Sequence, residues 1–162
     1  MAEAKVGDDF ITHEFDEAIA IQQSICDAGD KLSSSHPVAS VKRQLSADLK
    51  VDQRHLAQLQ KFGKPFGAVG KREEVAEALG SLADETSAKA GSEESEAYEA
   101  HAVLLNLKRK QQDSADAMIK IARDRKDTDL RDAATKMKKE IKASADALGK
   151  SLADFAVQIA SA

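Results

Sequence analysis

The stretch TDLRDAATKMKKEIKASADALGKSLADFAVQIA, residues 128–160, decides the fold class. Its apolar residues recur three and four positions apart, which places them on one face of a helix, and Thr128 can cap that helix at its start. The members of the stripe are Leu130, Ala134, Met137, Ile141, Ala145, Leu148, Leu152, Phe155 and Ile159. The pattern predicts a long amphipathic helix with one apolar face to bury.

The same spacing predicts further helices upstream. The long ones are expected over residues 12–33, 37–62 and 93–124. Thr12 can cap the first of them, and Pro37 has the fixed backbone angle that suits the first turn of the second. A shorter helix is expected over 73–89. Its weaker apolar stripe consists of Val75, Leu79 and Leu82.

Connection lengths indicate how these helices are joined. The first and second helices are separated by a short link, as are the third and fourth, so each pair is expected to be antiparallel. Residues 63–92 make a much longer connection, which is typical of a chain that crosses from one end of a bundle to the other. We therefore expect an all-α, ferritin-like four-helix bundle, with residues 1–11 as a tail and 12–162 as a single domain. An up-down-up-down bundle that carries the short helix as an addition is the alternative.

The composition of the 162-residue chain excludes several classes of protein. The single Cys26 excludes a disulfide framework within the chain and a multi-cysteine zinc site. No apolar run is long enough for a membrane span, and residues 1–9 lack the basic-then-apolar order of a signal peptide. We expect a cytoplasmic protein, or a periplasmic one if a leader has been removed.

Charge is unevenly distributed along the chain. Residues 73–99 hold nine acidic and one basic residue, whereas residues 100–142 hold twelve basic and seven acidic ones. The basic stretch is interrupted by acids and lacks interleaved aromatic residues, so no binding to nucleic acid is expected. The glycines of 63–70 follow a helix and lack a Gly-Lys-Ser/Thr ending, so no nucleotide is expected either.

One short motif has a known counterpart. Asp52-x-x-His55, on the helix expected over 37–62, resembles the Glu-x-x-His signature of ferritin-like diiron proteins. Glu14 or Glu17 lies at about the same distance from the turn between the first two helices, so one of them is expected to face this motif. The resemblance implies half of a metal site.

The chain from Phe10 to Leu148 also resembles a small bacterial ferritin-like family of uncharacterised function, whose members are often described as periplasmic or outer-membrane proteins. The matching features are Phe10-Ile11, Pro37, Val41-Lys42, Asp48, Leu56, Leu59, Gly63, Tyr98 and Asp127-Thr128-Asp129-Leu130. That family tends to carry three histidines at positions where this chain has Leu49, Gln111 or Gln112, and Ser144.

A complete dimetal centre needs about six inward-facing carboxylates and histidines. At the matching depth the last two long helices offer Asn106, Leu107 and Lys108, and Glu140, Ile141 and Ala143. The second half of the site is therefore missing. We expect Lys108 to form a buried ion pair with Asp52 or Glu140 instead, in the space that a metal would occupy.

The remaining histidines and the cysteine lie outside this motif. His13 is expected at the surface, His36 in a turn, and His101 packed or solvated on an alanine-rich helix face. Cys26 is expected toward the core, with no basic neighbour in sequence to activate it.

These patterns favour a non-catalytic ferritin-like bundle with an incomplete dimetal site. We expect it to act as a binding or structural module, with no catalytic residue and no cofactor, and the resemblance loosely implies a stress-related role. One alternative is a metal-binding protein or metal-dependent oxidase that holds iron or manganese on Glu17, Asp52, His55 and Glu140. The other is a subunit of a helical assembly, through a protein partner or self-association, because the last two helices are longer than the first two.

Overall fold

The computed structural model describes residues 2–162, and the side chains of residues 7–162. These residues form five α-helices and one short 3-10 helix, η1, with no strand among them. The elements are α1 (Ala2–Ser35), α2 (Ala39–Gly63), η1 (Lys64–Phe66), α3 (Glu74–Lys89), α4 (Glu94–Asp124) and α5 (Thr128–Ala160). The all-α prediction is confirmed. Within the described part of the chain, no helix combines the length and apolar character needed to cross a membrane.

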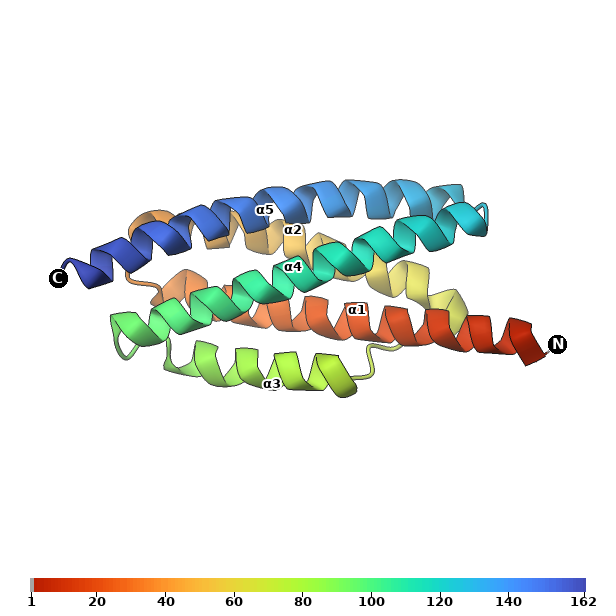
Figure 1. Cartoon of the computed structure of the whole chain (residues 1–162), viewed down its shortest axis with the longest axis horizontal. Helices are drawn as coiled ribbons and strands as arrows, with labels where there is room; N and C mark the ends of the chain where they lie inside the picture. Colours follow the sequence, from red (N-terminus) through yellow and green to blue (C-terminus); the bar gives the residue numbers. More distant parts are fainter. Residues whose placement is uncertain (1) are drawn as a thin grey trace.

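Four long helices lie side by side, and α3 lies along the outside of α1 and α4 (Figure 1). The pairs α1–α2 and α4–α5 are both antiparallel, as the short connections predicted. The helices α1 and α5 run in one direction, whereas α2 and α4 run in the other (Figure 1). The connection from α2 to α4 therefore returns along the length of the molecule, and α3 makes most of that return.

The first helix starts earlier than predicted. It begins at Ala2, so the expectation that residues 1–11 form a tail is wrong for residues 2–11. Thr12 lies within the helix and is not a cap; its hydroxyl lies 2.9 Å from the backbone oxygen of Asp8 and 2.8 Å from that of Phe66, and either oxygen can accept its proton. The reason is packing, because Ile11 is buried one turn before Phe15 and extends the apolar stripe toward the N-terminus.

The short helix buries a face that shares only Leu79 with the predicted stripe, and Leu79 is partly buried against the core. Val75 and Leu82 are each 45% exposed. The buried residues of α3 are the small ones at helical spacing, Ala76, Gly80, Ala83 and Ser87. Small side chains let α3 lie close to α1 and α4, so close packing decides the face rather than the size of the apolar side chains.

One carboxylate of α1 binds three consecutive backbone N–H groups of the connection between α2 and α3. Oδ1 of Asp16 accepts backbone N–H groups from Val69 at 2.8 Å, Gly70 at 2.8 Å and Lys71 at 3.1 Å. Gly70 has φ of +81°, and a Cβ there would lie 2.6 Å from Cγ2 of Ile19. The turn therefore needs glycine both for its backbone angle and for its contact with α1.

The apolar core is divided into two clusters along the bundle. One includes Ile21, Ile25, Leu45, Leu104 and Leu148, and the other includes Phe15, Leu59, Met118, Met137 and Ile141. Where the two clusters meet, buried polar residues lie on α1, α2 and α4, and the half-buried Ser144 lies on α5, so the centre of the bundle is a polar layer. The candidate site lies in this layer.

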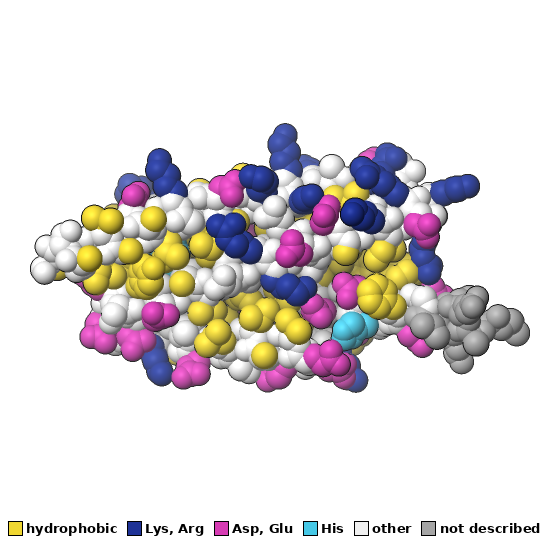
Figure 2. All heavy atoms as spheres, in the orientation of Figure 1, with side chains coloured by type: hydrophobic (Ala, Val, Ile, Leu, Met, Phe, Trp, Pro, Cys, Tyr) yellow, Lys and Arg dark blue, Asp and Glu magenta, His cyan; other side chains and the backbone are white. Residues whose placement is uncertain are grey.

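The uneven charge of the sequence is visible on the surface. Figure 2 shows acidic side chains gathered along α3 and basic ones along α4 and α5. Acidic and basic residues alternate over α4 and α5, as expected for solvated helix faces that carry local ion pairs.

Candidate functional site: a buried ion pair at the bundle centre

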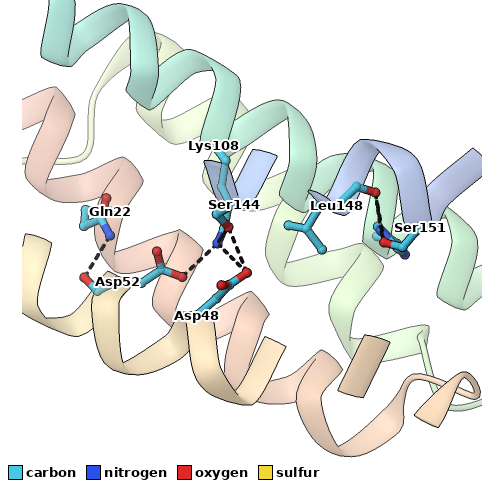
Figure 3. A network of polar contacts seen from close by, with 8 residues as sticks. Gln22, Asp48, Asp52, Lys108, Ser144, Leu148 and Ser151 are labelled. Atoms are coloured by element: carbon cyan, nitrogen blue, oxygen red, sulfur yellow. Dashed lines mark hydrogen bonds and ion pairs between the residues drawn. The ribbon is translucent and has the colours of Figure 1, made fainter. Parts of the chain in front are cut away.

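Lys108 of α4 points into the centre of the bundle and is 2% exposed. Its Nζ lies 3.0 Å from Oδ2 of Asp52 and 3.6 Å from Oδ2 of Asp48, both on α2. It also donates a hydrogen bond of 2.7 Å to Oγ of Ser144 on α5, and that hydroxyl donates to Oδ2 of Asp48 at 2.8 Å (Figure 3). All the donors of the ammonium therefore face oxygen atoms.

Two glutamines continue this layer toward α1. Nε2 of Gln22 donates to the backbone oxygen of Asp52 at 2.9 Å. Nε2 of Gln111 donates to the backbone oxygen of Ala18 at 2.7 Å and to Oε1 of Gln22 at 3.0 Å. The polar layer therefore ties all four long helices together by side-chain hydrogen bonds.

The electrostatics of the layer follow from burial. Burial raises the pKa of the Asp52 carboxyl, and the ammonium of Lys108 partly opposes that shift. Asp48 adds a second negative charge beside the same ammonium and raises the pKa of Asp52 further. Two carboxylates share one ammonium, so the chain's own cation offsets part of the negative charge at the centre of the bundle.

The residues predicted as metal ligands are placed in two different surroundings. Oε1 of Glu17 pairs with Nζ of Lys110 at 2.7 Å. Asp52 pairs with Lys108, whereas Glu140 pairs with Arg54 rather than with Lys108. Over residues 7–162, one group of three side chains has its metal-ligating atoms within 4.8 Å of one another, and it consists of His13, Glu14 and Glu17.

His55 is the other predicted ligand, and its side chain is 1% exposed. Its Nε2 lies 3.5 Å from Oε1 of Glu140, and neither ring nitrogen has a hydrogen-bond partner in the described part of the chain. Burial lowers the pKa of His55, and the charge of Glu140 acts in the opposite direction. The structure thus joins His55 to Glu140 but leaves the ring without the partners that a buried imidazole usually has.

A groove between α2 and α5 leads from the surface to the polar layer. Its volume is about 340 Å³. The lining residues are Gln44, Asp48, Val51, Asp52, Glu140, Ala143, Ser144 and Ala147. Asp48 and Ser144 were not predicted as part of the site, although Asp48 lies one helical turn before Asp52, which was a signal for a shared face.

Cys26 is buried, as predicted. Burial, with a smaller contribution from the charge of Asp52, raises the pKa of its thiol to about 12. The thiolate is the reactive form of cysteine, so burial disfavours the reactive form of this side chain.

Comparisons with known proteins do not assign the chain to a group. No protein-family model matches it, and no curated protein is significantly similar to it in sequence.

Proposed function

We propose that this chain is a non-catalytic helical bundle of ferritin-like connectivity that acts as a binding or structural module. The observation that supports this function is the position of Lys108 between Asp52 and Asp48. A divalent ion bound to these carboxylates would displace a buried ammonium and leave it unpaired, which is strongly unfavourable. The chain's own cation takes the place of a metal.

The donors at this level do not fit a dimetal centre. The helices α4 and α5 contribute Lys108, Gln111 and Ser144 where carboxylates and histidines would be needed. The ferritin-like connectivity is supported by the helix directions in Figure 1, in which α2 and α4 run the same way and a long connection joins them. A stress-related role rests on the family resemblance alone.

Metal binding to a matched pair of variants tests this function. Protein purified without chelator is melted with and without Fe²⁺, Mn²⁺ or Zn²⁺, since an ion at a hundred times its Kd adds about 2.7 kcal/mol to the free energy of unfolding. The wild-type melt is expected not to move. Lys108→Ala frees two carboxylates and is expected to gain a metal-dependent rise, whereas Lys120→Ala, at an exposed position of the same helix, gains none. About two iron or manganese ions per wild-type chain would contradict the proposal.

A second candidate function is binding of a single metal ion, and the unpaired ring of His55 favours it. The 3.5 Å between its Nε2 and Oε1 of Glu140 is long for a hydrogen bond but suits two ligands of one ion at about 2.0–2.2 Å each. Glu17 is held by Lys110 and Asp52 by Lys108, so neither completes this set. Iron-dependent oxygen consumption that His55→Ala abolishes would favour this function over the first.

A further inference from the structure

Two buried histidines join three parts of the chain at one end of the bundle. His36 lies in the link between α1 and α2, and His101 lies on α4; each is 1% exposed. Nε2 of His36 is 3.0 Å from Nδ1 of His101, and Nε2 of His101 is 3.0 Å from the backbone oxygen of Leu148 on α5. The backbone N–H of Val38 donates to Nδ1 of His36 at 3.1 Å. His36 is thus a turn residue, as predicted, but it is fully buried.

The direction of each hydrogen bond in this series, from Val38 through the two rings to Leu148, follows from the groups at its two ends. The oxygen of Leu148 only accepts, so Nε2 of His101 carries a proton and donates it. In the neutral ring Nδ1 of His101 is then an acceptor, so Nε2 of His36 must be the donor between the rings. Nδ1 of His36 is left to accept from Val38. All four ring nitrogens are satisfied only when both histidines are neutral and protonated at Nε2.

A further proton on either ring has no acceptor. It would sit on Nδ1 of His36, facing the N–H of Val38, or on Nδ1 of His101, facing the N–H of His36. Over residues 7–162, no carboxylate lies within 4.0 Å of either ring to pair with the new charge. Protonation therefore replaces a hydrogen bond with two opposed donors in a buried place.

The charged groups around the two histidines do not stabilise a protonated ring. From α2, the cation of Lys42 disfavours a charged His36. From α5, the exposed Asp154 lines a cavity of about 90 Å³ together with Ser151 and Phe155. Neighbouring contacts from α1 and α4 are uncharged: the backbone oxygen of Leu32, which accepts from His36 N at 2.9 Å, and the ring of Tyr98, which packs on Phe155.

We propose that the His36–His101 pair is an acid-sensitive latch, which holds the link between α1 and α2 against α4 and α5 and releases it when either ring gains a proton. Release would uncover Phe155, whose ring packs against His36 at a centroid distance of 4.8 Å. The other buried histidine, His55, lies in the central polar layer beside Glu140 and is not part of this link. This inference does not depend on the proposed function.

The titration of the rings supports the geometry. Burial lowers the pKa of His101 below its ordinary value. Burial, together with the charge of His101, lowers the pKa of His36 to about 4. A ring that is neutral while the link is bound, and charged once the link is released, makes release more favourable at low pH. For each such ring, the equilibrium constant for release rises by up to tenfold per pH unit below about 6.5.

The chain carries its own probe of this end. The sequence has one tyrosine, Tyr98, and no tryptophan. The ring centroid of Tyr98 is 6.2 Å from that of Phe155. Tyrosine fluorescence, far-UV circular dichroism and amide hydrogen exchange are followed on the whole protein between pH 7.5 and 4.5. After correction for intrinsic exchange rates, opening of residues 36–41 is expected to rise at least tenfold between pH 6.5 and 5, with a change in Tyr98 emission and constant helix content.

A matched pair of substitutions tests the assignment to the latch. The side chain in His101→Gln can still donate to Leu148 and accept from His36, but it does not titrate. One of the two titrating rings is then lost, so the equilibrium constant for release of the link should rise less steeply as the pH falls, by up to a factor of ten less per pH unit. His13→Gln makes the same change at a partly exposed histidine and should leave the wild-type response intact. Exchange that stays flat to pH 4.5, or that rises only together with loss of helix, overturns the proposal. If His101→Gln does not fold, nitrogen NMR of the wild-type rings decides: protonation of both within a closed bundle at pH 6 refutes the latch.

Discussion

Nζ of Lys108 and Oδ2 of Asp52 lie 3.0 Å apart at the centre of the bundle, where both side chains are almost completely buried. The pair links α4 to α2, the two long helices that run in the same direction and are joined by the long connection (Figure 1). Each member offsets the desolvation of the other. The energetic consequence is asymmetric, because removing one charge leaves the other buried without its partner.

Lys108→Met is therefore expected to lower the free energy of unfolding by about 3–5 kcal/mol, as measured by urea denaturation. The double variant Lys108→Met/Asp52→Leu should lose much less than the sum of the two single changes, because it removes both charges. Lys142→Met breaks an exposed pair with Asp146 and is expected to cost under about 1 kcal/mol. Additive effects of the two central substitutions would show that the pair is not coupled.

The glycines that follow α2 offer a matched comparison of backbone strain and space. Gly67 and Gly70 both have positive φ, +75° and +81°, but a Cβ at Gly67 meets nothing within 4 Å. Gly67→Ala is expected to cost about 1 kcal/mol from backbone strain alone. Gly70→Ala carries the same strain and also a clash with Ile19, so its loss of stability should be clearly larger. Equal losses on thermal or urea denaturation would contradict the packing of this turn against α1.

The sequence was sufficient to place most helices because their apolar stripes are long and regular. Seven of the nine residues predicted for the stripe of α5 are buried, and the helix runs over the predicted range, Thr128–Ala160, although Asp127 and not Thr128 caps it. The start of α1 was missed because Thr12 has the chemistry of a cap, while the burial of Ile11 is a tertiary effect. The face of α3 was missed for a related reason: Val75 and Leu82 are more apolar, but only small residues allow the close approach.

The candidate site could be predicted only in part, because sequence gives the level of a residue along a bundle but not its partner. Lys108 and Asp52 were expected near one another and are paired. Glu140 lies at the same level yet pairs with Arg54 of α2 and not with Lys108. The link from His36 to His101 joins residues far apart in sequence, and no local pattern announces it.

Cys26 provides a test of how tightly the core around the polar layer is closed. Its thiol is buried and its pKa is raised to about 12, so almost no thiolate exists at pH 8.5. Folded protein is expected to resist alkylation by iodoacetamide for hours at that pH, whereas protein in concentrated urea should react within minutes. Mass spectrometry of the modified fraction gives the measurement. Rapid modification of the folded chain would mean that the thiol is more accessible than its burial indicates.

Acid should weaken the fold through His36. In the unfolded chain this histidine takes up a proton near its ordinary pKa of about 6.5, whereas in the folded chain its pKa is about 4. Between these values the unfolded state binds more protons, so the free energy of unfolding falls as the pH falls. The loss is up to about 1.4 kcal/mol per pH unit and about 3 kcal/mol over the whole window. Urea denaturation at pH 7 and pH 5 measures it, with His36→Asn expected to show a smaller difference between the two conditions and His13→Asn the wild-type difference. A stability of His36→Asn that falls as steeply as that of the wild type would place the acid sensitivity elsewhere in the bundle.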